Sequence, residues 1–254
     1  MKNALKSVVS SLTVVIPTCD RGELLNRSLD CVLNQSLAPT EIILVDNGNE
    51  AANTRGLDPR VRVIRTAPRI GPGRARNIGA QAATSELVAF LDDDDLWQAD
   101  YLECVLARFG ETGADAVLAR LMRQADGFTA QPYKLMPNSA DAQRRVFWCN
   151  PGFGGQNLTI RRDVFLALGG FDETMPASED RDLAARLLLT GKRLVSQPSA
   201  VAILCDHSGG RARNSLIMGN WAFIKKHWRN MRVNELYRAL KVLAKRRILL
   251  FLEH

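Results

Sequence analysis

Apolar runs alternate with amphipathic stretches from the N-terminus to about residue 205. Strands are predicted where about four to eight apolar residues run together, and helices where apolar positions recur every three or four residues. The predicted strands cover residues 12–17, 41–45, 61–65, 87–91, 116–119 and 201–204. The predicted helices cover residues 23–34, 74–83, 101–109 and 180–190. This alternation favours an α/β fold with a mainly parallel, Rossmann-like sheet and helices on both faces.

Two segments depart from the alternating pattern. Residues 123–145 are polar, carry two prolines and lack clear periodicity, which predicts a long loop of the kind that often forms a lid or an insertion. The residues after 210 are basic and predict a helical extension. We therefore expect a main domain over 1–210 and a basic helical extension over 211–254.

Charge is concentrated in this extension. The chain carries 34 Lys and Arg against 27 Asp and Glu, a net charge of +7, and the segment from His207 to His254 holds 11 of these cations and 2 of the acids. Within it, Leu236, Leu240, Leu243 and Ile248 lie near one helical face. Two interpretations stay open: a helix docked on the main domain, or peripheral contact with anionic lipid. No zinc-finger spacing or RNA-binding aromatic motif is present, so nucleic acid is not expected as a partner.

Cysteine usage and hydropathy indicate the cytoplasm. The five cysteines are widely spaced and form no CxxC pair, which argues against a zinc site or a disulfide framework. No apolar run reaches about 18 residues, so no transmembrane helix is expected. The N-terminal residues are too weakly apolar for a signal peptide. We expect a cytoplasmic protein whose extension lies near the inner face of the cell membrane if it binds lipid.

Four consecutive aspartates, Asp92–Asp95, follow directly on the predicted strand 87–91. Carboxylates this close repel one another unless cations hold them. Oxygen ligands suit magnesium or manganese, and magnesium is usually held by one or two carboxylates together with substrate phosphates. The cluster therefore predicts a metal–diphosphate site, with a capping run or an adventitious cation site as the alternative.

Two more polar clusters follow predicted strands, at Thr18–Arg21 and at Asp46–Asn49. Ligands of open α/β sheets bind beyond the carboxyl ends of the strands. Each cluster alone is also compatible with an ordinary turn. Together with the aspartates, they predict one site at this edge of the sheet.

Six motifs then carry a resemblance to a known family. In chain order they are Val14–Thr18, Leu44–Gly48, Ala75–Gly79, Phe90–Trp97, Gly169–Glu173 and Ser178–Leu183. In this order the sequence resembles family 2 glycosyltransferases over roughly residues 11–210. The resemblance implies a GT-A fold with a donor-binding half at about 11–120 and an acceptor half at about 121–210. It also implies a nucleotide-diphosphate sugar donor of the UDP or dTDP type, Mn²⁺ or Mg²⁺, and inversion at the anomeric carbon.

The resemblance assigns roles on the diphosphate side. Asp92, Asp93 and Asp94 match the D-x-D element: Asp94 would touch the metal, and the other two would hold the ribose or the metal's waters. Asp95 resembles a residue that packs against or caps the following helix. Arg76 would face the diphosphate near a helix N-terminus, where the dipole favours an anion. Its alternative is a solvated arginine on a helix face.

The nucleoside side is assigned in the same way. Thr18 and Asp20 resemble residues that line the base and ribose pocket. Asp46 and Asn47 resemble the pair that reads the base. Asn47 stands where an aspartate is frequent, and because an amide both donates and accepts, the identity of the base stays open.

Inversion in one displacement needs a base on the face opposite the leaving group. By resemblance, Asp180 is the general base, and Glu179 orients the acceptor or lies near the diphosphate; otherwise both are first-turn acids favoured by the helix dipole. Trp148 is either the acceptor-side wall or a core tryptophan. His207 is either a ligand of the metal or phosphate, or a structural histidine.

The resemblance therefore implies transfer of a single sugar to a hydroxyl of a saccharide or lipid-linked acceptor, in glycan, polysaccharide or glycolipid biosynthesis. The Gln-x-x-Arg-Trp signature of processive members is missing. One alternative is a sugar-phosphate nucleotidyltransferase, although the first strand lacks the glycine-rich, Arg- and Lys-containing signature of that class. The other is a catalytically impaired nucleotide-sugar-binding or scaffolding protein.

Overall fold

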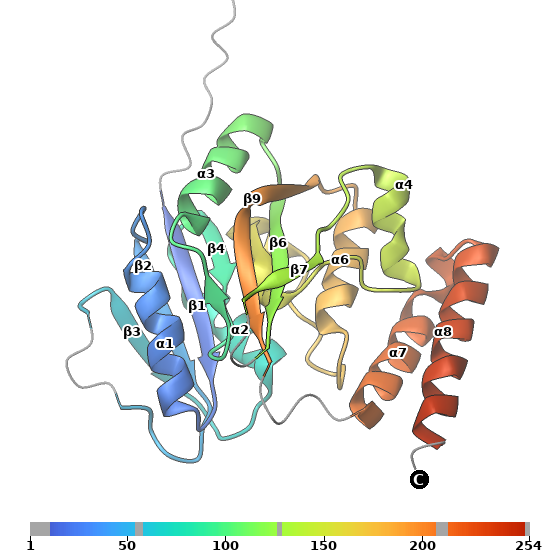
Figure 1. Ribbon diagram of the computed structural model, residues 1–254, viewed down its shortest axis with the longest axis horizontal. Helices are drawn as coiled ribbons and strands as arrows, with labels where there is room; N and C mark the ends of the chain where they lie inside the picture. Colours follow the sequence, from blue (N-terminus) through green and yellow to red (C-terminus); the bar gives the residue numbers. More distant parts are fainter. Residues whose placement is uncertain (1–10, 54–57, 126–128, 207–212, 252–254) are drawn as a thin grey trace, which may run out of the picture.

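A twisted nine-stranded sheet organises the part of the chain that the computed structural model describes, residues 11–53, 58–125, 129–206 and 213–251 (Figure 1). Its strand order is β3-β2-β1-β4-β8-β6-β9-β5, with β7 paired to β6 off this path. The strands are β1 (Leu12–Thr18), β2 (Glu41–Asp46), β3 (Val61–Arg65), β4 (Leu87–Phe90), β5 (Leu96–Trp97), β6 (Ala116–Gln124), β7 (Gln131–Lys134), β8 (Leu158–Arg161) and β9 (Leu194–Cys205). The helices are α1 (Gly22–Leu33), α2 (Pro72–Ala82), α3 (Tyr101–Thr112), α4 (Ala140–Gln143), α5 (Arg162–Ala167), α6 (Glu179–Leu189), α7 (Arg213–His227) and α8 (Val233–Phe251), with 3₁₀ turns η1 (Arg144–Phe147), η2 (Gly155–Asn157) and η3 (Trp228–Asn230).

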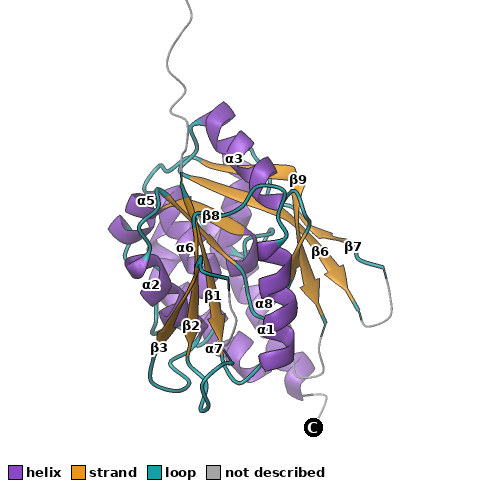
Figure 2. Cartoon of the chain, turned by 90° about the vertical axis from the view of Figure 1, so that its left-hand side faces the viewer, coloured by secondary structure: helices purple, strands orange, loops and turns teal. Residues whose placement is uncertain are grey.

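Parallel pairing is confined to parts of this sheet. Strands β3, β2, β1 and β4 are parallel neighbours, as the sequence predicts, and so are β6 and β9. β8 runs antiparallel to both β4 and β6, and β5 and β7 are antiparallel to their partners. The sheet is therefore mixed, with helices on both faces as expected (Figure 2).

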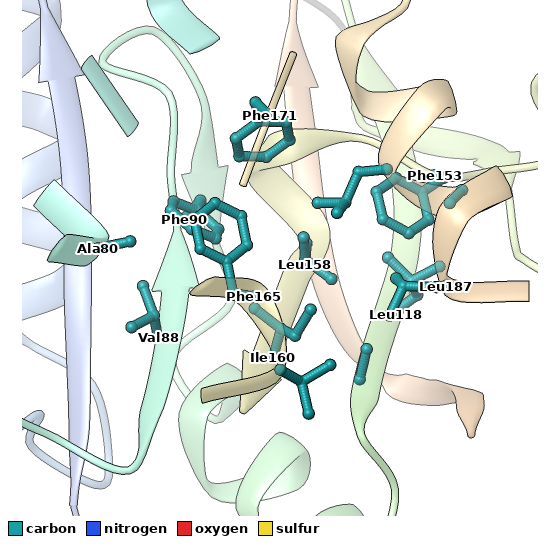
Figure 3. Packing of buried hydrophobic residues seen from close by; sticks show 14 of the residues in the cluster. Ala80, Val88, Phe90, Leu118, Phe153, Leu158, Ile160, Phe165, Phe171 and Leu187 are labelled. Atoms are coloured by element: carbon teal, nitrogen blue, oxygen red, sulfur yellow. The ribbon is translucent and has the colours of Figure 1, made fainter. Parts of the chain in front are cut away.

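Alternate side chains of the central strands face two separate cores. On β1, Val14 and Ile16 belong to the core under α1 and α3, and Val15 belongs to the core under α2, α5 and α6. Figure 3 shows the second core, where the rings of Phe90, Phe165 and Phe171 meet with centroids 5.2–5.4 Å apart. Because strand side chains alternate between faces, this pattern fixes the register of the sheet.

Element boundaries differ from the sequence prediction where the chain is polar. The predicted loop at 123–145 contains the end of β6, all of β7 and α4. β9 begins at Leu194 rather than at residue 201, and it pairs with β6 along most of its length. Backbone hydrogen bonds between β6 and β9 extend both strands through polar residues, where side-chain periodicity does not predict a strand.

The C-terminal residues form a pair of helices, α7 and α8, which we call the C-terminal hairpin (residues 213–251). It packs beside α6 and η1 at one end of the protein (Figure 1). Ile224, Ala239 and Leu243 are buried between its helices, and Arg144 of η1 pairs with Glu235 at 2.6 and 2.7 Å. One face of α8 is thus docked on the main domain. Among the described helices, none has the length and apolar character needed to cross a membrane.

Gly79 lies where α2 crosses β1, which gives a test of this packing. A Cβ at Gly79 would lie 2.3 Å from Cγ1 of Val15, whereas a Cβ at Gly110 of α3 would meet nothing within 4 Å. Gly79→Ala should lower the free energy of unfolding by roughly 2 kcal/mol, because overpacking outweighs the gain in helix propensity. The control Gly110→Ala should raise it by about 0.5–1 kcal/mol. Urea unfolding measures both, and stabilisation by both substitutions would contradict the close contact.

Candidate active site

The four aspartates form a turn beyond the carboxyl end of β4. The N–H of Asp95 donates to the carbonyl of Asp92 at 3.2 Å, so the chain reverses before β5. Trp97 anchors the turn, because its ring stacks on Tyr101 with centroids 4.0 Å apart and its Nε1 donates to the carbonyl of Gln156 at 2.7 Å. A tight turn sends successive side chains in different directions, so the four carboxylates are divided among several partners, of which Asp93 and Asp94 share Arg21.

Three of these carboxylates form a candidate cation site. Asp92, Asp94 and Asp95 each offer an oxygen, and these atoms lie within 4.8 Å of one another. Burial and the charges of Asp92 and Asp94 raise the pKa of Asp95 well above its usual value, a cost that a bound cation would relieve. An all-oxygen donor set of this size fits Mg²⁺ or Mn²⁺.

Asp95 differs from its sequence-based assignment. It does not cap the following helix, because α3 begins at Tyr101 after Asp100. Its carboxylate instead accepts the N–H of Cys205 at 3.0 Å, at the end of β9. Asp95 therefore joins the candidate cation site to the last strand. The other metal ligand suggested by the sequence, His207, lies outside the described residues.

Arg76 is buried between the aspartate turn and α6. Only 2% of its surface is exposed, its Nη2 pairs with Asp92, and its Nη1 lies 3.6 Å from Oε1 of Glu179. Gly155 makes room for it, because a Cβ there would lie 2.8 Å from Nε. Nε and Nη1 have no hydrogen-bond partner among the described residues. The solvated alternative for Arg76 is wrong, and the side chain links the two acidic groups of the site.

Arg21 is a site residue that the sequence did not single out. Its Nη1 pairs with Asp94 and lies 3.2 Å from Asp93. Thr18 Oγ1 donates to the same Asp93 at 2.8 Å. Burial raises the pKa of Asp93 to about 6, against the opposing effects of Thr18 and Arg21. The only signal for Arg21 in the sequence is its place in the polar cluster after the first strand.

Asp20 ties the loop after β1 to the loop after β2. Its backbone has a left-handed φ of 55°. Its carboxylate accepts the N–H and the side-chain Nδ2 of Asn49, each at 2.7 Å. Gly48 leaves space for this contact, because a Cβ there would lie 2.5 Å from Oδ1 of Asp20. Asp20 therefore sits at the predicted edge of the sheet and stabilises its loops.

Asp46 and Asn47 lie at the same edge and are both buried. The Asp46 carboxylate accepts the N–H of Ala52 at 2.8 Å and pairs with Arg65 at 2.6 Å. Asn47 Nδ2 donates to the carbonyl of Thr18 at 2.7 Å. The structure thus brings the nucleoside-side residues together, and their direct contact with a base stays a prediction.

The first turn of α6 carries the acidic pair on the acceptor side. Ser178, at its N-cap, has a left-handed φ of 70°, which is uncommon for a residue with a side chain. Glu179 is buried against Arg76, and Asp180 is half-buried. Asn150 Nδ2 lies 3.4 Å from Oδ2 of Asp180. The sequence did not single out Asn150, which helps to orient the predicted base.

Arg181, the next residue, joins α6 to η1 and to the C-terminal hairpin. Its guanidinium donates to the carbonyls of Val146 and Phe147 at 2.5 and 2.8 Å and to Oδ1 of Asn220 at 2.8 Å. It also lies 3.8 Å from the ring centroid of Phe223. Burial lowers the pKa of Arg181 to about 10.

Asp182 makes a second connection to the hairpin. Its fully buried carboxylate lies 2.8 Å from Nε2 of His227, 2.9 Å from Lys226 and 2.7 Å from Arg186. Burial acts to raise the pKa of Asp182, but these three partners outweigh it and hold the pKa at about 2. α6 is therefore fixed to α7 immediately after the predicted base.

Trp148 lies between the site and the hairpin. It is partly buried and packs against both the main core and the hairpin core. The guanidinium of Arg238 on α8 lies 4.9 Å from its ring centroid. Trp148 is thus a packing residue on one side, and its role as an acceptor wall stays a prediction.

Solved structures identify the class of fold. The structure of GalNAc-T7 with UDP, GalNAc and Mn²⁺ matches with a TM-score of 0.65 at 16% sequence identity, over 86% of this chain and 48% of that one. With this architecture and strand arrangement, the protein has the GT-A fold. A model of glycosyl transferase family 2 matches residues 13–169, and the chain belongs to that family. This confirms the resemblance drawn from the six motifs.

Curated relatives agree with this assignment. A pre-mycofactocin glycosyltransferase of Mycobacterium tuberculosis is 31% identical over 206 residues, which cover 77% of this chain. The succinoglycan biosynthesis protein ExoO of Rhizobium meliloti is 26% identical over 245 residues, which cover 86% of this chain and 69% of that protein. The chain spans 43% of the length of the M. tuberculosis relative.

The Asp182 network predicts a loss of stability when its acceptor is removed. Asp182→Asn should lower the free energy of unfolding by about 3 kcal/mol, because it removes a fully buried carboxylate that Arg186, Lys226 and His227 share. The pKa of Asp182 is lowered on folding, so its contribution is full above the unfolded value near 4 and is lost as the pH falls through about 2. The difference between wild type and variant should therefore shrink over that range in acid.

Asp141→Asn is the matched control for this prediction. Asp141 pairs with Arg232 at 3.2 Å but its side chain is 85% exposed, so its replacement should leave stability nearly unchanged. Chemical unfolding at several pH values measures both variants. Equal effects for the two would show that the Asp182 network does not hold α6 and α7 together.

Proposed function

We propose that the protein transfers a single sugar, with inversion, from a nucleotide-diphosphate sugar of the UDP or dTDP type to an acceptor hydroxyl. The observation that supports this most directly is the aspartate turn, which faces the acidic start of α6 across the buried Arg76. Membership of family 2 and the UDP, GalNAc and Mn²⁺ bound to the matching GalNAc-T7 structure also favour it. The family assignment argues against the nucleotidyltransferase alternative.

The donor would lie along the carboxyl edge of β1, β2 and β4. Asp92, Asp94 and Asp95 would hold Mn²⁺ or Mg²⁺, with His207 as a further ligand. A cation bound there neutralises the charge that develops on the departing diphosphate. Thr18, Asp20, Asp46 and Asn47, with Asp93, would surround the nucleoside.

Positive protein groups would also face the diphosphate. Arg21 already contacts two aspartates of the turn and remains partly exposed, so it is placed to meet a phosphate. Arg76 would add a second positive charge behind the aspartate turn, and its Nε and Nη1 have no hydrogen-bond partner among the residues that the structure describes. The N-terminus of α2 at Pro72 borders a hollow of about 80 Å³ that Glu179 also lines. Helix N-termini favour anions, so the start of α2 would add to the attraction of the diphosphate on this side of the site.

The acceptor hydroxyl would give its proton to Asp180. Asn150 holds that carboxylate, and the Glu179–Arg76 pair fixes the start of α6 relative to the aspartate turn. A single displacement with inversion requires a base on the side of the sugar opposite the leaving group, and Asp180 would be that base. Trp148 would form the wall beside the acceptor.

We also propose that the acceptor is a saccharide or a lipid-linked saccharide in polysaccharide or glycolipid biosynthesis. The relative from R. meliloti is described as a succinoglycan biosynthesis protein, which supports this class. The protein would work in the cytoplasm, with its basic extension near the inner face of the cell membrane. Nucleotide release from a panel of nucleotide sugars with manganese tests the function, and the absence of release from every donor would favour the impaired-binder alternative.

Asp180→Asn tests the general base. Turnover of the accepted donor should fall at least about a hundredfold, because the amide cannot take up the proton. Calorimetry should show UDP binding unchanged. Asp30→Asn, on the exposed face of α1, is the matched control and should retain full turnover. Full activity in Asp180→Asn would refute its assignment.

Asp94→Asn tests the cation site. Manganese-dependent binding of UDP should weaken at least about tenfold, because one of three carboxylate ligands becomes neutral. UDP binding measured without manganese should change little. Asp30→Asn again serves as the control. If manganese strengthens UDP binding equally in wild type and Asp94→Asn, the aspartate turn does not bind the metal.

A further inference from the structure

An apolar stripe runs along the solvent face of α8. Its members recur at intervals of three or four residues and so share one side of the helix: Val233, Tyr237, Leu240, Ala244 and Ile248. All five are exposed, Val233 at 89% and Ile248 at 59%. The other side of α8 is buried through Glu235, Ala239 and Leu243. α8 therefore has two apolar sides, and only one of them is covered by the described residues.

The neighbouring helix extends this exposed surface. Met218 and Trp221 on α7 are 60% and 51% exposed, and Trp228 in η3 is 50% exposed. α7 and α8 pack together through Ile224 and Leu243, and the two helices lie side by side (Figure 1). We call these exposed residues of 218–248 the hairpin surface. Large exposed apolar groups gathered in this way mark an interaction site.

Basic residues flank the stripe, and no exposed acid lies within the described part of the hairpin. Residues 213–251 contain ten Lys and Arg and a single acid, Glu235, which is buried and paired with Arg144. The exposed cations include Lys225, Arg229, Lys241, Lys245, Arg246 and Arg247. Any partner must therefore accept apolar side chains and supply many negative charges.

We infer that the hairpin surface docks on an anionic lipid bilayer. A helix that lies in the membrane interface buries its apolar side among the acyl chains and places Lys and Arg at the headgroups. Tryptophan and tyrosine favour this boundary, because each has an apolar ring and a polar atom. A second copy of this chain would bring two sets of cations together, which opposes self-association through the same surface.

Docking there would also orient the site. α6 is tied to α7 through Asp182, and Arg238 on α8 lies over Trp148. The acceptor side therefore adjoins the hairpin. On the basis of the proposed function, this favours a lipid-linked acceptor over a free saccharide.

Sedimentation with vesicles tests the inference, using the full chain and vesicles of phosphatidylcholine with and without phosphatidylglycerol. The protein should bind only the anionic vesicles, and binding should weaken as salt rises. The variant with Tyr237→Ser, Leu240→Ser and Ile248→Ser should bind at least about tenfold more weakly, because it loses the apolar contribution. Lys241→Gln with Lys245→Gln should lower the partition coefficient about fivefold for each cation removed.

Arg27→Gln with Arg193→Gln is the control, because it removes the same charge from exposed positions on α1 and before β9. It should bind like wild type. No binding to anionic vesicles, or equal weakening in the control and the Lys241/Lys245 variant, would overturn the inference. A dimer in light scattering that the triple serine variant abolishes would assign the surface to a second copy instead. UDP binding by calorimetry without vesicles should be normal in all variants, so loss of lipid binding is separable from failure of the proposed function.

Discussion

The site depends on one buried guanidinium. Arg76 is 2% exposed, and a charge so far from water is tolerated only with close counter-charges. Asp92 and Glu179 supply them from two segments that are far apart in the sequence. The pair of contacts fixes the distance between the aspartate turn and the start of α6. Arg76 therefore links the proposed donor and acceptor sides, and a glycine at position 155 leaves the space that its side chain occupies.

Four consecutive side chains at the start of α6 contact different neighbours. Glu179 faces Arg76, Asp180 faces Asn150, Arg181 enters the η1 and α7 contact, and Asp182 binds α7. A helix turns by about 100° per residue, so adjacent residues necessarily point to different neighbours. The same turn that carries the predicted base, Asp180, thus anchors the hairpin, so a peripheral pair of helices is joined directly to the candidate site.

The features that could be predicted from the sequence are those marked by a repeated apolar pattern or by a cluster of polar residues. Alternating apolar runs gave the parallel strands, and the position of Asp92–Asp95 after a strand gave the edge where the site lies. It could not show that Arg76 is buried, because burial depends on Phe171 and Gly155, which come from other segments. Asn150 carries no charge and belongs to no motif, so only its distance from Asp180 reveals it. The antiparallel direction of β8 was also hidden, because side-chain periodicity does not report the direction in which a strand runs.

The extension shows how two interpretations of one pattern can both apply. A docked helix and an interfacial helix each require an apolar side, and the sequence spacing of α8 was consistent with either. The prediction that Leu240, Leu243 and Ile248 share one face is wrong: Leu243 is buried on the docked side with Glu235 and Ala239, whereas Leu240 and Ile248 remain exposed with Tyr237 on the opposite side. Docking by itself explains neither the exposed side nor the cations around it. α8 packs on α7, which Asp182 fixes to α6, so α8 has little conformational freedom left to lose. Contact with a bilayer would therefore cost little additional ordering, and it would act directly on the orientation of the proposed acceptor side.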